Sequence, residues 1–244
     1  MKITQAKAIE FARLLRDYRN NNEPLIRVGR DNDGGYLIED PIMPIPIVFS
    51  MGIETDASFD LHFALKGIKV FQFDPNIEAP PIENTKFVFS RVAISHITSA
   101  TTISLTDAIT KPDCDVENAI LKFDIEGHEW MALASIDPKL LGRFQTIVGE
   151  FHFFDAIADK RYYDLFMLVL KKLALSHTLT HLHPNNRTGI SIIEGVILPR
   201  LAELTWRRSD ISMFSPNLGS HLSPLDLPCD PEKPEILLPN YWMY

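Results

Sequence analysis

The sequence predicts an α/β protein built on a doubly wound, mostly parallel β-sheet. Three observations point to this class. Short apolar segments alternate with amphipathic helical patterns over most of the chain, and this alternation is typical of parallel sheets. Several segments, with 119–123 and 144–148 the clearest, are apolar at nearly every position, as strands buried on both faces are. The last two segments, 191–197 and 200–208, are joined by a short Leu-Pro linker and are expected to be antiparallel.

At the N-terminus the sequence predicts a helix followed by a hairpin. Residues 4–19 place apolar side chains on one helical stripe with basic side chains opposite. Apolar stretches at 25–30 and 36–38 flank an Asp-Asn-Asp-Gly-Gly turn, a pattern typical of a β-hairpin. Prolines at positions 41, 44 and 46 then make a stiff connection to the first core strand.

The core elements follow in chain order. We expect strands at 47–51, 69–73, 86–93, 101–105, 119–125, 145–152, 178–183, 191–197 and 200–208. We expect helices at 57–66, 127–135 and 160–175. The predicted organisation is a single domain with an N-terminal helix and hairpin (1–46), a core (47–208) and a proline-rich tail (209–244). The tail is expected to wrap the surface or to meet a partner, with poor order as the alternative.

Composition narrows the class of function. The chain has 244 residues, 45% hydrophobic and 23% charged, which is enough for one domain with a full core. Its net charge of −8 argues against broad binding of nucleic acid. Cys114 and Cys229 are far apart in the sequence and form neither a metal-type pair nor a disulfide scaffold. The sequence contains no signal pattern and no apolar run of membrane length, so we expect a cytoplasmic protein.

The segment 47–56, read together with 69–74, has the pattern of a nucleotide-binding βαβ unit. A strand ends at Gly52, a helical pattern follows, and the next strand ends at Asp74, 22 residues after the glycine. A carboxylate about 20 residues after such a turn bonds ribose hydroxyls. Only one glycine of the usual G-x-G-x-x-G is present, and a pyrophosphate needs close backbone approach along the whole loop. The pattern therefore favours S-adenosylmethionine (SAM), which has no phosphate, over NAD; an ordinary α/β turn is the alternative.

Polar residues gather after several predicted strands. They lie at 124–129, at 150–152 and at 181–186, and the late strand carries Glu203. In an open α/β sheet the ligand binds at the carboxyl edge of the strands, so we expect these residues to converge on one cleft.

The segment 124–129, Asp-Ile-Glu-Gly-His-Glu, closely resembles the D-x-E-G-x-E signature of the FkbM-type methyltransferases. Segments 33–36 and 50–53 are similar to stretches found upstream in that family, and the resemblance runs from about Arg27 to Arg208. It implies a Rossmann-like, class I SAM-dependent methyltransferase with a seven-stranded sheet. Such enzymes usually act on oxygen, and less often nitrogen, of a sugar or natural product, as in the modification of capsular polysaccharide.

The resemblance also implies which residues bind the cofactor. Ser50, Gly52 and Asp56 are expected at the methionine end, Asp74 at the ribose, and Asp107 and Asp124 beside the sulfonium. Carboxylates suit that position because the sulfonium is a cation. Asp107 is equally well explained as a helix N-cap.

Methylation of an alcohol also needs a base or a metal. His152 is the first candidate base and His183 the second, because imidazole titrates near neutral pH. Alternatively, a divalent metal could lower the pKa of the acceptor; the candidate ligands are Asp124, Glu126, Glu150, His152 and His183. The metal-free mechanism is favoured, because mixed clusters of histidine and carboxylate also arise from acid–base networks.

The acceptor is expected to be a small molecule or saccharide, with a carbohydrate, a sugar phosphate and a natural product all open. Arg27 and Arg30 would bind an anionic acceptor if the hairpin folds over the cleft. Tyr36 and Glu126 are further candidates for acceptor binding. Tyr36 and Trp130 could offer aromatic faces to a sugar ring, although core packing is the favoured explanation for both. Two rivals stay open: a nucleotide-binding enzyme of another class, such as a hydride transferase, and a non-catalytic SAM-fold subunit. The sequence leaves the oligomeric state open, a homodimer included.

Overall fold

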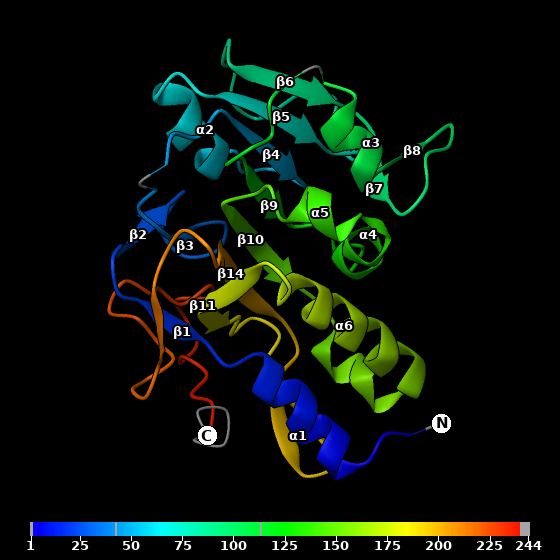
Figure 1. Ribbon diagram of the computed structural model, residues 1–244, viewed down its shortest axis with the longest axis vertical. Coiled ribbons are helices and arrows are strands. Elements are labelled where there is room, and N and C mark those ends of the chain that lie inside the picture. The colour runs from blue at the N-terminus through cyan, green and yellow to red at the C-terminus, as the bar shows by residue number, and fades with distance from the viewer. Residues whose placement is uncertain (1, 42, 113, 240–244) are drawn as a thin grey trace.

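A seven-stranded sheet with the order β11-β14-β10-β9-β4-β5-β6 forms the centre of the molecule in the computed structural model, which describes residues 2–41, 43–112 and 114–239 (Figure 1). The strands are β4 (Ile47–Met51), β5 (Lys69–Phe73), β6 (Phe87–Ser90), β9 (Ile120–Phe123), β10 (Thr146–Phe151), β11 (His177–Pro184) and β14 (Ala202–Arg208). Strand β14 runs antiparallel to both β10 and β11, and the pairings among β10, β9, β4, β5 and β6 are parallel. The predicted α/β class, with a mostly parallel seven-stranded sheet and an antiparallel last strand, is confirmed.

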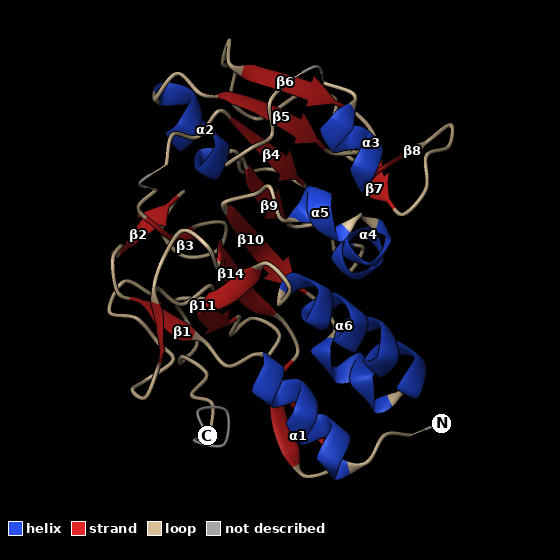
Figure 2. Ribbon diagram, in the orientation of Figure 1, coloured by secondary structure: helices blue, strands red, loops and turns tan. Residues whose placement is uncertain are grey.

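Helices cover both faces of this sheet (Figure 2). They are α1 (Gln5–Leu14), α2 (Ser58–Leu65), α3 (Leu105–Thr110), α4 (Glu129–Ser135), α5 (Pro138–Leu141), α6 (Lys160–Leu173) and the 3₁₀ turn η1 (Phe154–Ala158). Side chains alternate between the faces of each strand, so neighbouring residues enter different cores. Phe49 packs in the core under α1, α4 and α6, whereas Val48 packs in a second core under α2 and the hairpin.

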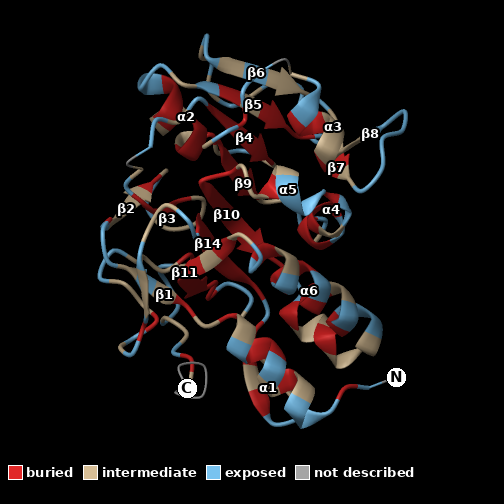
Figure 3. Ribbon diagram, in the orientation of Figure 1, coloured by how far each residue is buried: buried red, intermediate tan, exposed pale blue. Residues whose placement is uncertain are grey.

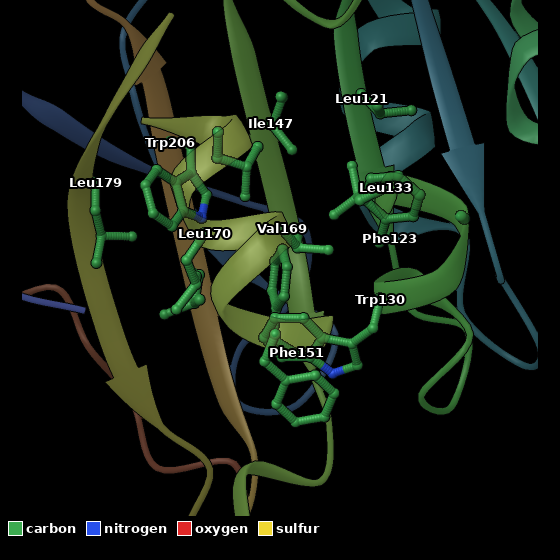
Figure 4. Close-up of a cluster of buried hydrophobic side chains, with 14 of the residues drawn as sticks. Leu121, Phe123, Trp130, Leu133, Ile147, Phe151, Val169, Leu170, Leu179 and Trp206 are labelled. Atoms are coloured by element: carbon green, nitrogen blue, oxygen red, sulfur yellow. The ribbon is translucent and has the colours of Figure 1, made fainter. Parts of the chain in front are cut away.

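The larger core is built from aromatic and branched side chains (Figure 4). Trp130 of α4 stacks on Phe166 of α6 with ring centroids 3.9 Å apart and meets Phe151 of β10 edge to face. Its indole N–H donates to the backbone oxygen of His152 at 2.7 Å. The core thereby fixes the carboxyl end of β10, where polar residues follow.

The N-terminal hairpin folds onto the second face of the sheet. It consists of β2 (Leu25–Val28) and β3 (Tyr36–Glu39), which pair antiparallel as the sequence predicts. Three further two-stranded elements surround the sheet: β1 (Tyr18–Asn20) with β15 (Phe214–Pro216), β7 (Ala93–Ser95) with β8 (Thr102–Ser104), and β12 (Ile190–Ile193) with β13 (Val196–Pro199).

Several sequence-based boundaries differ from the structure. The first helix ends at Leu14, and the end of its predicted range instead forms β1. The predicted strand 86–93 is β6 plus the start of β7. The predicted strand 191–197 belongs to the separate β12–β13 ribbon, so β14 takes β11 and β10 as its antiparallel neighbours. Helices α3 and α5 were not predicted, because one or two turns carry too little periodicity.

The proline-rich tail packs against the body of the protein over its described part, 209–239. Asn217 donates to the Asp17 carboxylate at 2.7 Å, and the side chain of Asn32 donates to the Pro228 carbonyl at 2.8 Å. Cys229 of the tail is buried. Figure 3 shows that buried residues gather on the strands of the central sheet, with exposed residues mostly on the surrounding loops and outer helix faces. The tail thus wraps the β11 edge of the sheet and contacts the hairpin turn. No helix in the described ranges is long and apolar enough to cross a membrane.

Candidate functional site

A cavity of about 270 Å³ opens at the carboxyl ends of β4, β5 and β9. Its lining includes Gly52, Asp74, Asn76, Ile94, Asp124 and His128. All of them except Ile94, which lies in β7, follow the parallel strands β4, β5 and β9, and this edge is where an open α/β sheet binds ligands. The segment 124–129 and the βαβ turn therefore meet at one place, as the sequence predicts.

Gly52 makes the first turn of this cavity. Its φ of +81° lies in the left-handed region, and a Cβ placed on it would lie 1.7 Å from the backbone oxygen of Asp124. The N–H of Gly52 donates to Phe73 at 2.8 Å, and the N–H of Asp124 donates to Met51 at 2.8 Å. The ends of β4, β5 and β9 are interlocked so closely that only glycine fits.

Asp74 shapes the same loop through backbone hydrogen bonds. Its Oδ2 accepts the N–H groups of Ile53 and Glu54 at 3.0 and 2.9 Å, and its Oδ1 accepts that of Asn76 at 2.8 Å. A carboxylate offers about four acceptor positions, so roughly one remains for a ligand. Asp74 borders the cavity as expected, but most of its bonding capacity holds the loop.

A smaller cavity of about 70 Å³ adjoins the first and shares Ile53, Glu54 and Asp124 with it. Charged side chains of both signs border it: Arg30, Asp33, Asp56, Asp60 and Lys122. Asp56 accepts the backbone N–H of Ser58 at 3.0 Å, at the start of α2.

Two of the expected cofactor residues lie outside both cavities. Ser50 is fully buried inside β4. Asp107 lies in the first turn of α3, where its backbone N–H donates to Ser104 at 3.0 Å and its carboxylate accepts from Thr98. The N-cap of α3 is therefore Ser104, and the structure gives Asp107 no contact with either cavity.

Lys122 supplies a buried positive charge beside Asp124. Its ammonium donates to the Gly52 carbonyl, lies 4.0 Å from Asp124 Oδ2 and lies 5.7 Å from the centre of the Tyr36 ring. The Tyr36 hydroxyl lies 3.4 Å from the same Asp124 oxygen. Burial, followed by the charge of Asp124, raises the pKa of Tyr36, so this hydroxyl stays protonated and acts as a donor.

His152 follows β10 and is surrounded by carboxylates. Its backbone N–H donates to Glu129 Oε1 at 2.6 Å, and Nδ1 lies 3.2 Å from the same oxygen. Nε2 lies 3.4 Å from Glu126 and 3.5 Å from Glu150. Burial alone would lower the pKa of His152, but the bond to Glu129 and the nearby negative charges outweigh it, so the pKa is raised.

Glu150 is the most perturbed acid of this group. Burial is the largest cause that raises its pKa, and the charges of Asp124, Glu203 and Asp33 add to it. Asn185 donates to Glu150 Oε1 at 2.8 Å. The elevated pKa favours a protonated Glu150, which adds no negative charge beside His152.

The structure brings three of the candidate metal ligands together. Asp124, Glu150 and His152 each offer a ligand atom within 4.8 Å of the others. Glu126 contacts His152 but has a side chain 83% exposed. His183 belongs to a different group, with Glu203 and Cys229.

The two arginines of the hairpin are largely engaged by the protein. Arg27 donates to the carbonyls of Arg30 at 3.1 Å and of Asn32 at 2.7 Å, so it holds the turn of the hairpin. Arg30 donates to the Asp33 carbonyl and lies 3.5 Å from Asp56 Oδ2, with its side chain 49% exposed. Only Arg30 of this pair borders one of the two cavities described above.

Three residues that organise this site lie in segments identified from the sequence, although the sequence-based prediction gave them no role. Glu129 is completely buried and orients His152, and Lys122 neutralises charge at the strand end. The sequence could have indicated both, since Lys122 is a charged residue within an apolar strand and Glu129 is the last residue of the D-x-E-G-x-E segment. Asp33 borders the smaller cavity and faces Arg187 at 3.2 Å, a contact across the fold without a local signal.

A family model, the methyltransferase FkbM domain, matches residues 20–174, more than half of the chain. The chain belongs to the FkbM methyltransferase family. The match runs from β1 to the end of α6 and includes Gly52, Asp74, Asp124 and His152. Strands β11 and β14 and the tail lie outside the matched residues of this FkbM methyltransferase. No curated protein matches the chain.

Proposed function

We propose that this FkbM methyltransferase transfers the methyl group of SAM to an oxygen, or less readily a nitrogen, of a carbohydrate or natural-product acceptor. The observation that carries the proposal is the cavity beside Gly52, Asp74 and Asp124, with His152 adjoining at the end of the next strand. A cofactor held in this cavity would present its methyl group toward the histidine.

The two adjoining cavities suit the two ends of SAM. The larger has apolar walls from Ile94 and Ile125 with Asp74 at its edge, which suits adenosine. The smaller contains Arg30 for a carboxylate and Asp56 for an ammonium group, which suits the methionine end. Asp124 borders both cavities, so it would face the sulfonium between them.

His152 is the proposed base. If Nδ1–H donates to Glu129, Nε2 carries the lone pair that accepts the proton of the acceptor hydroxyl. As the oxygen attacks, the S–CH₃ bond breaks, its electron pair stays on sulfur, and S-adenosylhomocysteine (SAH) leaves. Glu129 stabilises the imidazolium that forms, and alignment of oxygen, methyl and sulfur supplies further rate.

A neutral acceptor fits this site better than a phosphorylated one. After burial, the charges of Asp124 and Glu203 raise the pKa of both Asp33 and Glu150, so the site is already negative and a phosphate would add to the repulsion. The guanidinium of Arg27 donates to backbone carbonyls of the hairpin, so it does not offer these hydrogen bonds to a phosphate. We therefore favour a hydroxyl group of an uncharged sugar or natural product.

Calorimetry and a transfer assay test the proposal. The chain should bind SAH and not NAD, and labelled SAM should methylate members of a panel of neutral saccharides in preference to their phosphates. A folded chain that binds NAD, or that fails to bind SAH, would contradict the cofactor assignment. Preference for the phosphates would contradict the acceptor assignment alone.

A further inference from the structure

Three potential metal ligands meet at the β11 edge of the sheet, outside the residues matched by the family. They are His183 of β11, Glu203 of β14 and Cys229 of the tail, and each is buried, with at most 3% of its surface exposed. One ligand atom from each lies within 4.8 Å of the other two. Segments far apart in the sequence thus converge on one buried point.

The spacing of these atoms is close to that of a zinc site. Glu203 Oε2 lies 3.0 Å from His183 Nδ1, and Glu203 Oε1 lies 3.3 Å from Cys229 Sγ. Zinc bonds to nitrogen, oxygen and sulfur at the usual lengths separate tetrahedral ligands by about 3.4–3.6 Å. The two distances involve different oxygens of Glu203, so the carboxylate lies between the other two ligands. One ligand atom from each residue lies within 4.8 Å of the others, and side-chain rotations would bring the three around a metal.

The fourth residue of the cluster orients the histidine. Glu235 of the tail lies 3.2 Å from His183 Nε2, the ring nitrogen that faces away from Glu203. Histidines that bind a metal through one nitrogen almost always donate the other N–H to a carboxylate or carbonyl. Nδ1 is therefore the ligand atom, and Glu235 fixes the plane of the ring.

The charge of the surroundings favours a cation at this point. Two further acidic side chains lie beside the cluster: Glu150 is the partner of Glu203 across the sheet, and Glu235 lies 3.2 Å from His183. A divalent cation bound by one thiolate, one carboxylate and one neutral imidazole would form a neutral unit there.

We propose that His183, Glu203 and Cys229 form a binding site for a divalent metal of the zinc class, which fastens the tail to the edge of the sheet. The ligand set of imidazole, carboxylate and thiolate is one that zinc accepts, and the thiolate disfavours magnesium and calcium. The fourth coordination position is left to water. This site is distinct from the Asp124–Glu150–His152 group, and it does not depend on the proposed acceptor or base.

Cobalt(II) is the probe, because a cobalt–thiolate bond gives a charge-transfer band that oxygen and nitrogen ligands do not give. The full-length chain is stripped with a chelator, kept reduced with a phosphine and titrated with Co²⁺. The chain contains only two cysteines, Cys114 and Cys229. In Cys114→Ser, any thiolate band must come from Cys229, so this variant reports on the site without altering it.

The expected result is one equivalent of Co²⁺ with a thiolate band in both the parent and Cys114→Ser, and displacement of that band by one equivalent of Zn²⁺. Cys229→Ser should lose the band, and Glu235→Gln should bind the metal roughly 10-fold or more weakly. Zn²⁺ should also slow proteolysis within 209–239 in Cys114→Ser but not in Cys229→Ser.

A titration of folded Cys114→Ser without a thiolate band would overturn the proposal. The four side chains would then form a hydrogen-bonded lock without a metal. A band that persists in Cys229→Ser would also overturn it, because the metal would be bound elsewhere. Neither result would bear on SAH binding or methyl transfer, which are measured separately.

Discussion

The two sides of Asp124 are built in different ways. On one side, the loop around Gly52 and Asp74 is held by backbone groups, with a carboxylate that accepts three N–H bonds and a glycine that no side chain can replace. On the other side, His152 and Glu150 contact each other and their neighbours through side chains. Changes to the first side should therefore alter its shape, and changes to the second should alter its charge.

The largest effect is expected from Gly52→Ala. The new Cβ would overlap the Asp124 carbonyl, so the ends of β4 and β9 must separate, at a cost of about 3 kcal/mol or more. SAH binding should be lost, as measured by calorimetry, and the denaturation midpoint should fall.

Gly67→Ala is the matched control for this substitution. Gly67 has a similar φ of +83°, but nothing lies within 4 Å of its Cβ position. It should lose only about 1 kcal/mol of stability and keep its SAH affinity. Equal losses in the two variants would show that backbone conformation, rather than the contact with Asp124, makes Gly52 necessary.

His152→Ala tests the side of Asp124 that is formed by His152 and Glu150. It should lower kcat by roughly 10²–10⁴-fold while SAH affinity stays level, since general-base catalysis contributes in that range. His96→Ala, at an exposed histidine, is the control and should leave kcat unchanged. An unchanged kcat in folded His152→Ala would remove this residue as the base.

The pH dependence of kcat should follow from the same histidine. A base must be neutral to accept a proton, and the pKa of His152 is raised by Glu129 and its neighbours in spite of burial. Activity should therefore rise with pH through that raised pKa. Removing the Glu129 charge with Glu129→Gln should shift the rise of kcat to lower pH. An unchanged pH profile of kcat would contradict the pairing of His152 with Glu129.

Asp74→Ala should have a smaller effect than Gly52→Ala. It removes the acceptor for three backbone N–H groups and one expected bond to the ribose, so SAM binding should weaken by ~1.5–3 kcal/mol. Asp107→Asn is the comparison, because Asp107 borders neither cavity and should bind SAH normally. A loss of SAH affinity in Asp107→Asn but not in Asp74→Ala would show that Asp107, and not Asp74, binds the cofactor.

The smallest effect is expected from Arg30→Ala. Its ion pair with Asp56 is half exposed and contributes less than about 1 kcal/mol to stability. The affinity for SAH should fall modestly if Arg30 meets the methionine carboxylate, while the KM of a neutral acceptor should stay level. A rise in the KM of the acceptor with unchanged SAH affinity would show that Arg30 contacts the acceptor rather than the cofactor.

The sequence predicted the parts of this molecule that depend on local pattern. Strands 47–51 and 69–73 have the expected bounds, and Gly52, Asp74 and Asp124 border one cavity. The parts that depend on contacts across the fold were not predictable. The guanidinium of Arg27 donates to nearby backbone carbonyls, and His183 contacts Glu203 and the tail. Strand pairing and the position of the tail determine these contacts. The sequence around Cys229 does not predict its surroundings, because its neighbours His183 and Glu203 come from β11 and β14.

A crystal structure of the chain with SAH tests the proposed cofactor site and base most directly. We expect the adenine beside Ile94, the sulfur beside Asp124, and His152 Nε2 within roughly 8 Å of the methyl position, the reach of a base acting directly or through one water. SAH bound elsewhere would contradict the cofactor site. A His152 beyond that distance, with no water or metal between, would contradict the proposed base.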